Sequence, residues 1–173
     1  MLRELGVAVT PLPFELHREI PPEGRPVNPS RYGRFVDMAA EVGLPFTAPE
    51  RVVNTRRALS VAEAVRAFSP AAFDAVDRAL FTAYWAEQRD ISSWDELSAV
   101  VSAAAPEVDF DSVQTAVDEG RLLPVLKAYH EAAAEAGVTG TPAWLIDGRM
   151  LIPGFQDREL FEHVVQRLRD RPV

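Results

Sequence analysis

The sequence contains no cysteine. Its 173 residues therefore supply no disulfide, no thiolate nucleophile and no cysteine ligand for a metal ion. Histidine is also scarce: only His17, His130 and His163 are present, and their spacing matches no metal-binding motif. We therefore expect no metal site, and zinc chemistry is not expected from this chain.

The chain also lacks a long apolar run and an excess of positive charge. No stretch approaches the roughly 20 apolar residues that a transmembrane helix needs. No charged-then-apolar leader opens the sequence, so we expect a cytoplasmic protein. The formal net charge of -8 argues against nucleic acids and anionic membranes as partners.

What is present is an ordinary globular composition, with 47% hydrophobic and 25% charged residues. The length suits one domain with a substantial core. Residues 7–16 begin with β-branched side chains and nearly alternate, which predicts a strand, and Pro11 and Pro13 place this strand near a sheet edge or a bulge. Prolines crowd residues 21–29, which predicts a loop.

Helices are predicted through the middle of the chain. Ser30 or Asn28 provides an N-cap for the first helix and Gly43 ends it. Ser93 and Glu96 have the spacing of a capping box. Apolar residues recur at helical intervals between such signals. The predicted helices span residues 30–42, 55–68, 70–87, 93–104, 109–120 and 122–136.

The tail of the chain changes character. Residues 143–146 and 149–152 are strand-like, and Asp147-Gly148 between them is a strong signal for a tight hairpin turn. Asp157 then caps a final amphipathic helix. A helical block between two parts of one small sheet is an α/β arrangement with an insertion.

Thr141-Pro142 stands directly before the first strand of this hairpin. Proline has no backbone N–H and fixes φ, so it suits the first residue of a strand and not its interior. An X–Pro bond has lost most of the usual preference for trans, and a tight entry to a strand is a place where cis is expected. One large class of proteins uses a proline at such a position as the wall of an active site.

Several segments of the chain carry a resemblance to a known family, in one order and over nearly the whole length. They are Pro13-Phe14-Glu15-Leu16-His17 with Ile20-Pro21-Pro22-Glu23-Gly24; Asn54-Thr55 with Ala58-Leu59; Ala79-Leu80-Phe81-Thr82-Ala83-Tyr84-Trp85 with Arg89-Asp90-Ile91; Ala136-Gly137-Val138-Thr139-Gly140-Thr141-Pro142; and Gly154-Phe155-Gln156. With them the chain resembles the DsbA family of thioredoxin-like proteins in its FrnE-like branch, which is related to 2-hydroxychromene-2-carboxylate isomerases and kappa-class glutathione transferases.

The resemblance implies an α/β thioredoxin-like fold with a helical insertion. It implies one DsbA-like domain over residues 1–173, with thioredoxin-like parts at 1–20 and 137–170 and the insertion at about 30–136. Family members begin with a strand and a Cys-X-X-Cys turn, or a serine in the isomerase and transferase branches. Here Leu2 and Leu5 before Gly6 look like the end of the helix that follows this turn, so the N-terminal strand and the catalytic turn are missing from the chain.

The missing strand is central in thioredoxin-like sheets, where it lies between the strands expected at Val7 and Ala143. Three explanations remain open. The sequence starts at an internal methionine of a longer product, which we favour; another chain or a dimer mate supplies the strand; or the sheet has re-paired around the gap. A gap would leave buried backbone groups unsatisfied, at a cost on the order of 1 kcal/mol or more for each group.

The resemblance places a substrate-binding site at Gly140, Thr141 and Pro142, where backbone groups pair with an extended substrate or with glutathione. Asn54 is a further candidate for the same groove, with a plain helix N-cap as the alternative. Phe14 is a candidate for the pocket floor together with Trp144, with simple core packing favoured for both. No catalytic residue is expected in this chain, and no cofactor, although glutathione is left open.

The leading functional hypothesis is a DsbA/FrnE-type thiol–disulfide oxidoreductase homologue that is redox-inactive as written, because exchange needs a thiolate. One alternative is a glutathione-dependent isomerase or transferase of the 2-hydroxychromene-2-carboxylate type. The other is a non-catalytic thioredoxin-like module that binds a peptide or a partner. The expected partners are an extended peptide, a thiol substrate or glutathione, and a homodimer is left open.

Overall fold

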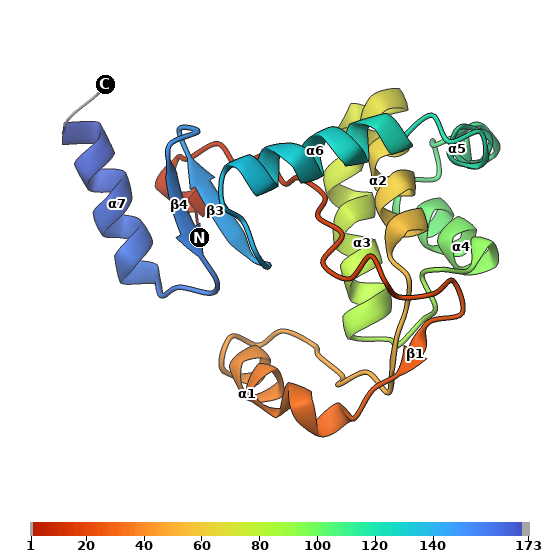
Figure 1. Ribbon diagram of the computed structural model, residues 1–173, viewed down its shortest axis with the longest axis horizontal. Coiled ribbons are helices and arrows are strands. Elements are labelled where there is room, and N and C mark those ends of the chain that lie inside the picture. The colour runs from red at the N-terminus through yellow and green to blue at the C-terminus, as the bar shows by residue number, and fades with distance from the viewer. Residues whose placement is uncertain (1, 171–173) are drawn as a thin grey trace. The chain divides into compact units, whose positions relative to one another are not determined.

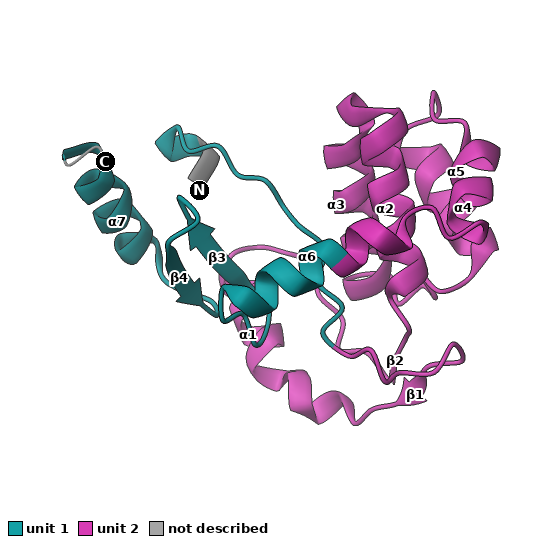
Figure 2. Cartoon of the chain, turned by 45° about the horizontal axis from the view of Figure 1, so that its top comes forward, with its two compact units in different colours: residues 1–16, 128–173 teal, residues 17–127 magenta. Residues whose placement is uncertain are grey.

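The computed structural model describes residues 2–170, and the chain divides into two compact units. Residues 17–127 form the helical unit, and residues 1–16 together with 128–173 form the hairpin unit (Figure 2). The elements follow one another along the chain as labelled in Figure 1. Whether the chain counts as one domain stays a prediction.

Five α-helices lie wholly within the helical unit. They are α1 (Gly33–Glu41), α2 (Arg56–Phe68), α3 (Phe73–Trp85), α4 (Trp94–Ala104) and α5 (Phe110–Asp118). Two 3₁₀ turns and one short antiparallel ladder accompany them: η2 (Pro29–Tyr32), η3 (Pro70–Ala72), and β1 (Arg25–Pro26) paired with β2 (Arg51–Val52). The ladder crosses a segment expected to be only loop. It was not predicted because two-residue strands leave no periodic signal.

Aliphatic side chains from four helices form the core of the helical unit. Apolar residues three or four positions apart place one face of α2 and α3 inward. The largest side chains with almost no exposure are Val61, Val65, Val76, Leu97, Val101 and Val113. Close packing of branched aliphatic residues of this kind is the main source of stability of a helical block.

The predicted helices are confirmed, with shifts of a few residues at their ends. Asn28 and not Ser30 caps the first of them, since its side chain accepts a hydrogen bond from the backbone N of Ser30 at 3.0 Å. Gly43 has a φ of +69°, the left-handed conformation expected after a helix. Asp109 caps α5 by accepting from the backbone N of Ser112 at 3.4 Å.

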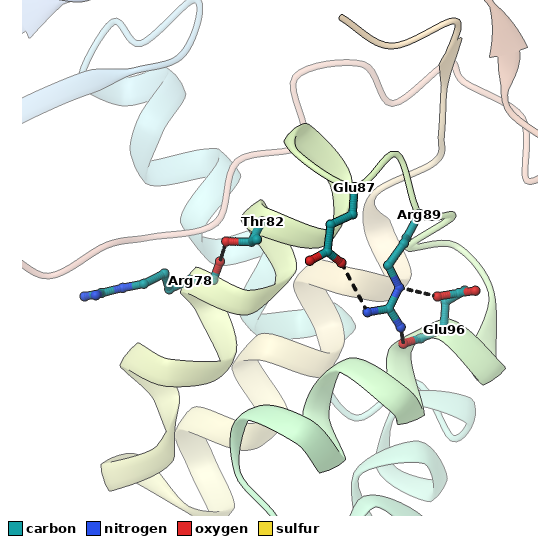
Figure 3. A network of polar contacts seen from close by, with 5 residues as sticks. All are labelled: Arg78, Thr82, Glu87, Arg89 and Glu96. Carbon is teal, nitrogen blue, oxygen red and sulfur yellow. Dashed lines mark hydrogen bonds and ion pairs between the residues drawn. The ribbon is translucent and has the colours of Figure 1, made fainter. Parts of the chain in front are cut away.

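The capping box predicted at the start of α4 is wrong. The Ser93 side chain makes no capping hydrogen bond. Glu96 instead accepts a hydrogen bond from Nε of Arg89 at 2.5 Å, and Nη1 of Arg89 lies 3.5 Å from the Glu87 carboxylate (Figure 3). A charged guanidinium binds a carboxylate more strongly than a backbone amide does, so the ion pair takes the side chain that the box requires.

The hairpin unit contains a two-stranded antiparallel sheet and a helix. β3 (Ala143–Ile146) pairs with β4 (Met150–Pro153), and α7 (Arg158–Asp170) follows them. Asp157 caps α7 as predicted, accepting from the backbone N of Leu160 at 2.8 Å. The unit also includes the 3₁₀ turn η1 (Leu2–Leu5) and the C-terminal part of α6 (Leu123–Glu135). Phe161 is its most buried large side chain, at 2% exposure.

The hairpin turn is slightly longer than predicted. Asp147 and Gly148 have φ values of +50° and +67°, and the N–H of Arg149 donates to the carbonyl of Ile146 at 3.0 Å. Positive φ at both central residues is the geometry that matches the twist of a hairpin. Because Ile146 pairs with Met150, three residues and not two lie between the strands.

The strand predicted at residues 7–16 is not formed. The segment is extended, and its exposure alternates between half-buried Val7 and Val9 and exposed Ala8 and Thr10, as in a strand. Within residues 2–170, however, no second strand runs beside it to form a ladder. A strand is defined by its pairing, so local β-propensity alone does not produce one.

No helix within residues 2–170 has both the length and the apolar character required to cross a membrane.

Candidate functional site

The candidate site is the loop between α6 and β3 in the hairpin unit. α6 ends in a turn at Gly137, whose φ is +79°. The chain then runs through Gly140 and Thr141 to Pro142, and the Thr141–Pro142 peptide bond is cis. The carbonyl of Pro142 accepts a hydrogen bond from the N–H of Gly154 at 2.8 Å, which continues the hairpin ladder by one residue.

A small hollow of about 140 Å³ lies along this loop. Its lining consists of the loop itself and of residues that the hairpin brings opposite to it. The lining residues are Gly137, Val138, Thr139, Gly140, Thr141, Pro142, Ala143, Leu151, Pro153 and Gly154. Gly140, Thr141 and Pro142, the three loop residues predicted for the site, therefore share one concave surface.

The lining contains no carboxylate, imidazole, amine or guanidinium. The polar groups available there are backbone N–H and C=O groups and the hydroxyls of Thr139 and Thr141. Such a surface has no general acid, general base or activated nucleophile. It suits a neutral extended backbone, which needs hydrogen-bond partners and not a countercharge.

Sequence reasoning missed Leu151 and Pro153 as lining residues. Both belong to β4, and the antiparallel register places Pro153 opposite Ala143. The Asp147-Gly148 signal alone does not find them, because the two-residue turn that it predicts would place Ile152 and not Pro153 opposite Ala143.

Phe14 lies in the hairpin unit but does not line the hollow. Its ring stacks on the imidazole of His130, with centroids 5.4 Å apart and an angle of 24° between the planes. Trp144 packs edge-on against Phe161 at 5.1 Å. The contacts of Phe14 and Trp144 are those of packing residues, the role that the sequence favoured for both.

Two ring nitrogens of these aromatic contacts are buried without a hydrogen-bond partner among residues 2–170. They are Nδ1 of His130 and Nε1 of Trp144. The indole N–H is a donor only, and burying it unpaired costs on the order of 1–3 kcal/mol. Both atoms belong to the hairpin unit.

Asn54 belongs to the helical unit, where both ends of its amide are used. Its Nδ2 donates to the carbonyl of Ile20 at 2.6 Å, and its Oδ1 accepts from the backbone N of Arg56 at 3.0 Å. The second bond satisfies an N–H in the first turn of α2. Asn54 therefore caps the start of α2 and also fixes the preceding segment through its hydrogen bond to Ile20, both within the helical unit.

A wider hollow of about 590 Å³ lies in the helical unit near the start of α5. Its acidic side chains include Glu107, Asp109 and Asp111. Asp109 is already used, because its carboxylate accepts from the hydroxyl of Ser112 at 2.6 Å, and this hydrogen bond holds the pKa of Asp109 below its usual range. The Asp109–Ser112 pair is accounted for by its place at the N-cap of α5.

Two carboxylates elsewhere in the helical unit, those of Glu63 and Asp77, have raised pKa values. Glu63 is 5% exposed and forms an ion pair with Nε of Arg66 at 3.1 Å. Burial raises the pKa of Glu63, and Arg66 opposes this shift. Burial likewise raises the pKa of Asp77, which also faces the charge of Arg66. Among residues 2–170, no three His, Cys, Asp or Glu side chains are grouped as metal ligands.

Comparison with known proteins agrees with this architecture. The family model of the DSBA-like thioredoxin domain matches residues 3–166. No curated protein sequence matches the chain. The crystal structure of a probable DsbA oxidoreductase from Streptomyces coelicolor is similar with a TM-score of 0.80 and 17% identity, over 92% of this chain and 74% of that one.

A second solved structure, of a protein from Nitrosomonas europaea named as a candidate disulfide isomerase, is similar with a TM-score of 0.57 and 18% identity, over 86% of this chain and 78% of that one. At such identities the likeness shows the fold alone. The predicted α/β thioredoxin-like fold with a helical insertion is therefore confirmed.

Proposed function

The chain belongs to the family of DSBA-like thioredoxin domains, and on that premise we propose that it is a FrnE-like member whose 173 residues hold substrate without performing redox chemistry. The substrate is an extended peptide segment, held at Gly140, Thr141 and Pro142. The observation that carries the proposal is the hollow at this loop, whose lining is made of backbone and neutral side chains.

The size of the hollow supports a peptide segment as its occupant. Sites for small molecules commonly enclose about 300–1,000 Å³, whereas this hollow measures about 140 Å³. An extended chain needs less enclosure, because its backbone pairs with a strand-like edge and only alternate side chains enter pockets. Thr141 is exposed, and its backbone N–H and C=O have no hydrogen-bond partner within residues 2–170, so both are available for such pairing.

Thiol–disulfide exchange itself is outside the chemistry of these 173 residues. Exchange requires a thiolate that attacks a disulfide, and the sequence has no cysteine. We expect the purified chain to give no turnover in an insulin-reduction assay with dithiothreitol. Turnover above the dithiothreitol background would refute the claim that this chain is redox-inactive.

Peptide binding is tested by calorimetry with a blocked hexapeptide of alternating valine and threonine. A second hexapeptide with proline at alternate positions has fewer N–H donors, and we expect it to bind about tenfold more weakly or not at all. Heat from neither peptide, or equal affinity for both, would overturn strand addition at this loop.

Two glycine substitutions localise the binding. A Cβ built on Gly140 or on Gly33 meets no atom within 4 Å, and neither residue has a left-handed φ. Gly140→Leu places a side chain at the hollow, and we expect it to weaken peptide binding about tenfold. Gly33→Leu lies in α1 and is expected to leave binding unchanged. Equal behaviour of the two variants would place the peptide elsewhere.

Glutathione in the same calorimeter tests the isomerase or transferase alternative. Glutathione has two carboxylates, and the hollow offers no cation to meet them. We therefore expect no heat from millimolar glutathione. Saturable binding that Gly140→Leu abolishes would favour the glutathione-dependent class over peptide binding.

A further inference from the structure

The tip of the β3–β4 hairpin is Asp147-Gly148, and nowhere else in the 173 residues does a glycine follow an aspartate or an asparagine. Both residues are exposed, and their φ values of +50° and +67° are left-handed. Glycine adopts this conformation freely, and aspartate adopts it more readily than most residues. The turn that these two residues suit therefore also sets a carboxyl group beside a peptide nitrogen that no Cβ of its own residue hinders.

Neither of these two groups is engaged within residues 2–170. The carboxylate of Asp147 makes no hydrogen bond or ion pair there, and the N–H of Gly148 finds no acceptor among the same residues. A Cβ built on Gly148 would meet no atom within 4 Å, so the space around this residue is open. The turn is closed instead by the N–H of Arg149, which donates to the carbonyl of Ile146 at 3.0 Å. The side chain of Asp147 is therefore free to rotate toward the nitrogen of Gly148.

Aspartates at helix starts are more constrained. The carboxylate of Asp109 accepts from the hydroxyl of Ser112 at 2.6 Å, and that of Asp157 caps α7. Asp111 also precedes a small residue, but it lies in the first turn of α5, where the N–H of Ser112 donates to Asp109 at 3.4 Å. A helix fixes the backbone dihedral angles, and ring closure between a side chain and the next nitrogen requires them to change. Asp111 therefore serves as an internal comparison for Asp147.

We propose that Asp147 is a site of spontaneous isomerisation to isoaspartate, through a cyclic succinimide formed with Gly148. The nitrogen of Gly148 attacks the side-chain carboxyl carbon of Asp147, a C–N bond forms, the nitrogen loses its proton, and one carboxyl oxygen leaves as water. Water then adds back to either carbonyl of the ring. Opening at the side-chain carbonyl restores aspartate, whereas opening at the main-chain carbonyl leaves the chain connected through the side chain. Water is lost and regained, so the reaction needs no oxidant, reductant or cofactor.

The product changes the hairpin, because an isoaspartyl residue adds one carbon atom to the backbone of the turn. Three residues separate the paired residues Ile146 and Met150, and the register continues to Ala143 opposite Pro153. The turn of a hairpin fixes the register of its strands. A longer turn is incompatible with both this register and the 3.0 Å hydrogen bond to Ile146, so we expect isomerisation to destabilise the hairpin unit. The inference does not depend on peptide binding at Gly140–Pro142.

The test is incubation of the whole chain for several weeks at physiological temperature in a mildly acidic buffer. After digestion, isoaspartate is quantified by transfer of a labelled methyl group from S-adenosylmethionine to its freed main-chain carboxylate, catalysed by an isoaspartyl methyltransferase, and is located by peptide mapping. We expect it at position 147 and not at position 111. Asp147→Glu would have to close a larger ring, so we expect methyl transfer to its turn peptide to be about tenfold lower or less. The matched control Asp111→Glu is expected to leave methyl transfer unchanged.

A second comparison separates the folded turn from the sequence alone. In guanidinium chloride the backbone of Asp147-Gly148 is unconstrained, and we expect the folded chain to form isoaspartate within about tenfold of the rate in denaturant. A slower reaction in the folded chain, or equal methyl transfer to Asp147→Glu, would overturn the proposal. The isomerised fraction, separated by chromatography, is expected to unfold at a lower temperature than fresh chain. Unchanged unfolding would overturn the expected loss of register.

Discussion

The sharpest prediction concerns the buried ion pair between Arg66 and Glu63. Replacing Arg66 with methionine keeps an unbranched apolar side chain over the ring of Phe73 but removes the guanidinium. We expect the variant to lower the free energy of unfolding of the helical unit by about 2–3 kcal/mol at pH 7. The cause is a carboxylate left in the interior without its countercharge.

The magnitude follows from the exposure of the two partners. Removing one member of a fully buried pair costs about 3–5 kcal/mol. The side chain of Glu63 is 5% exposed and that of Arg66 is 25% exposed, so water reaches the guanidinium. Because solvent weakens the ion pair, we expect about half of the cost for a fully buried pair. The guanidinium carbon of Arg66 lies 3.6 Å from the centroid of the Phe73 ring, and this cation–π contact adds about 0.5–1 kcal/mol.

The pH dependence distinguishes this mechanism from lost packing. Burial raises the pKa of Glu63 above its value in the unfolded chain, so the folded state binds more protons. The stability that Glu63 contributes is then present below the unfolded pKa and is lost as the pH rises through the folded pKa. Arg66 lowers the pKa of Glu63, so in Arg66→Met this pKa rises further, and the loss of stability becomes larger and extends to higher pH.

The assay is urea unfolding at pH 7.0 and pH 5.0, followed by tryptophan fluorescence in a Trp144→Phe background. The remaining tryptophans, Trp85 and Trp94, both belong to the helical unit. We expect the cost of Arg66→Met to be smaller at pH 5.0, and Arg66→Met/Glu63→Gln to be more stable than Arg66→Met at pH 7.0. A cost independent of pH, without recovery in the double variant, would refute the reasoning.

A matched control removes a guanidinium that is not buried. Arg78 lies on α3, and its side chain extends away from the ion pairs formed by Arg89 (Figure 3). Arg78→Met is expected to change the free energy of unfolding by less than about 0.5 kcal/mol at both pH values. A loss equal to that of Arg66→Met would mean that general charge balance, and not the buried pair, sets the effect.

Two further predictions concern packing and capping. Phe161→Ala should destabilise the hairpin unit by about 3–5 kcal/mol, because Phe161 is 2% exposed, whereas Phe155→Ala, at 66% exposure, should change little; equal thermal shifts would contradict this. Asn54→Ala loses two hydrogen bonds and should cost about 1–3 kcal/mol in urea unfolding, with Asn54→Asp recovering only the bond to the N–H of Arg56. An Asn54→Asp variant as stable as the wild type would show that the bond to Ile20 contributes nothing.

The fold was predictable wherever local signals decide it. Helix ends follow from caps such as Asn28 and Asp157, whose side chains accept backbone N–H groups two and three residues further along the chain. The hairpin follows from Asp147-Gly148, which adopt the positive φ that these residues favour. Each of these features depends on residues within a few positions of one another, so the sequence alone contains the needed information.

The wrong predictions all involve a partner distant in sequence or a competing side chain. Val7 and Val9 have the propensity for a strand, but a strand also needs a neighbour, and propensity does not reveal whether one is present. Ser93 and Glu96 have the spacing of a capping box, but the carboxylate of Glu96 pairs with Arg89, seven residues before it, instead of completing the box. Local sequence patterns predict which interactions a segment can form, and tertiary contacts determine which of them form in the folded protein.

The loop residues of the candidate site could be predicted from the sequence, but the residues on the opposite side of the hollow could not. Gly140, Thr141 and Pro142 were identified from sequence, while Leu151 and Pro153 enter the lining only through the register of the hairpin. Asn54 shows a different limit, because its residue type fits a binding role and a cap equally well. Its hydrogen bonds to Ile20 and Arg56 account for the whole side chain without any ligand.

The two units differ in how completely their polar groups are satisfied, and this difference bears on function. In the helical unit the buried carboxylate of Glu63 has its guanidinium. In the hairpin unit, Nδ1 of His130 and Nε1 of Trp144 are buried without a hydrogen-bond partner among residues 2–170. A buried polar atom without a partner is uncommon in a native structure and calls for an explanation, such as a functional role. The peptide site proposed at Gly140, Thr141 and Pro142 belongs to this same unit.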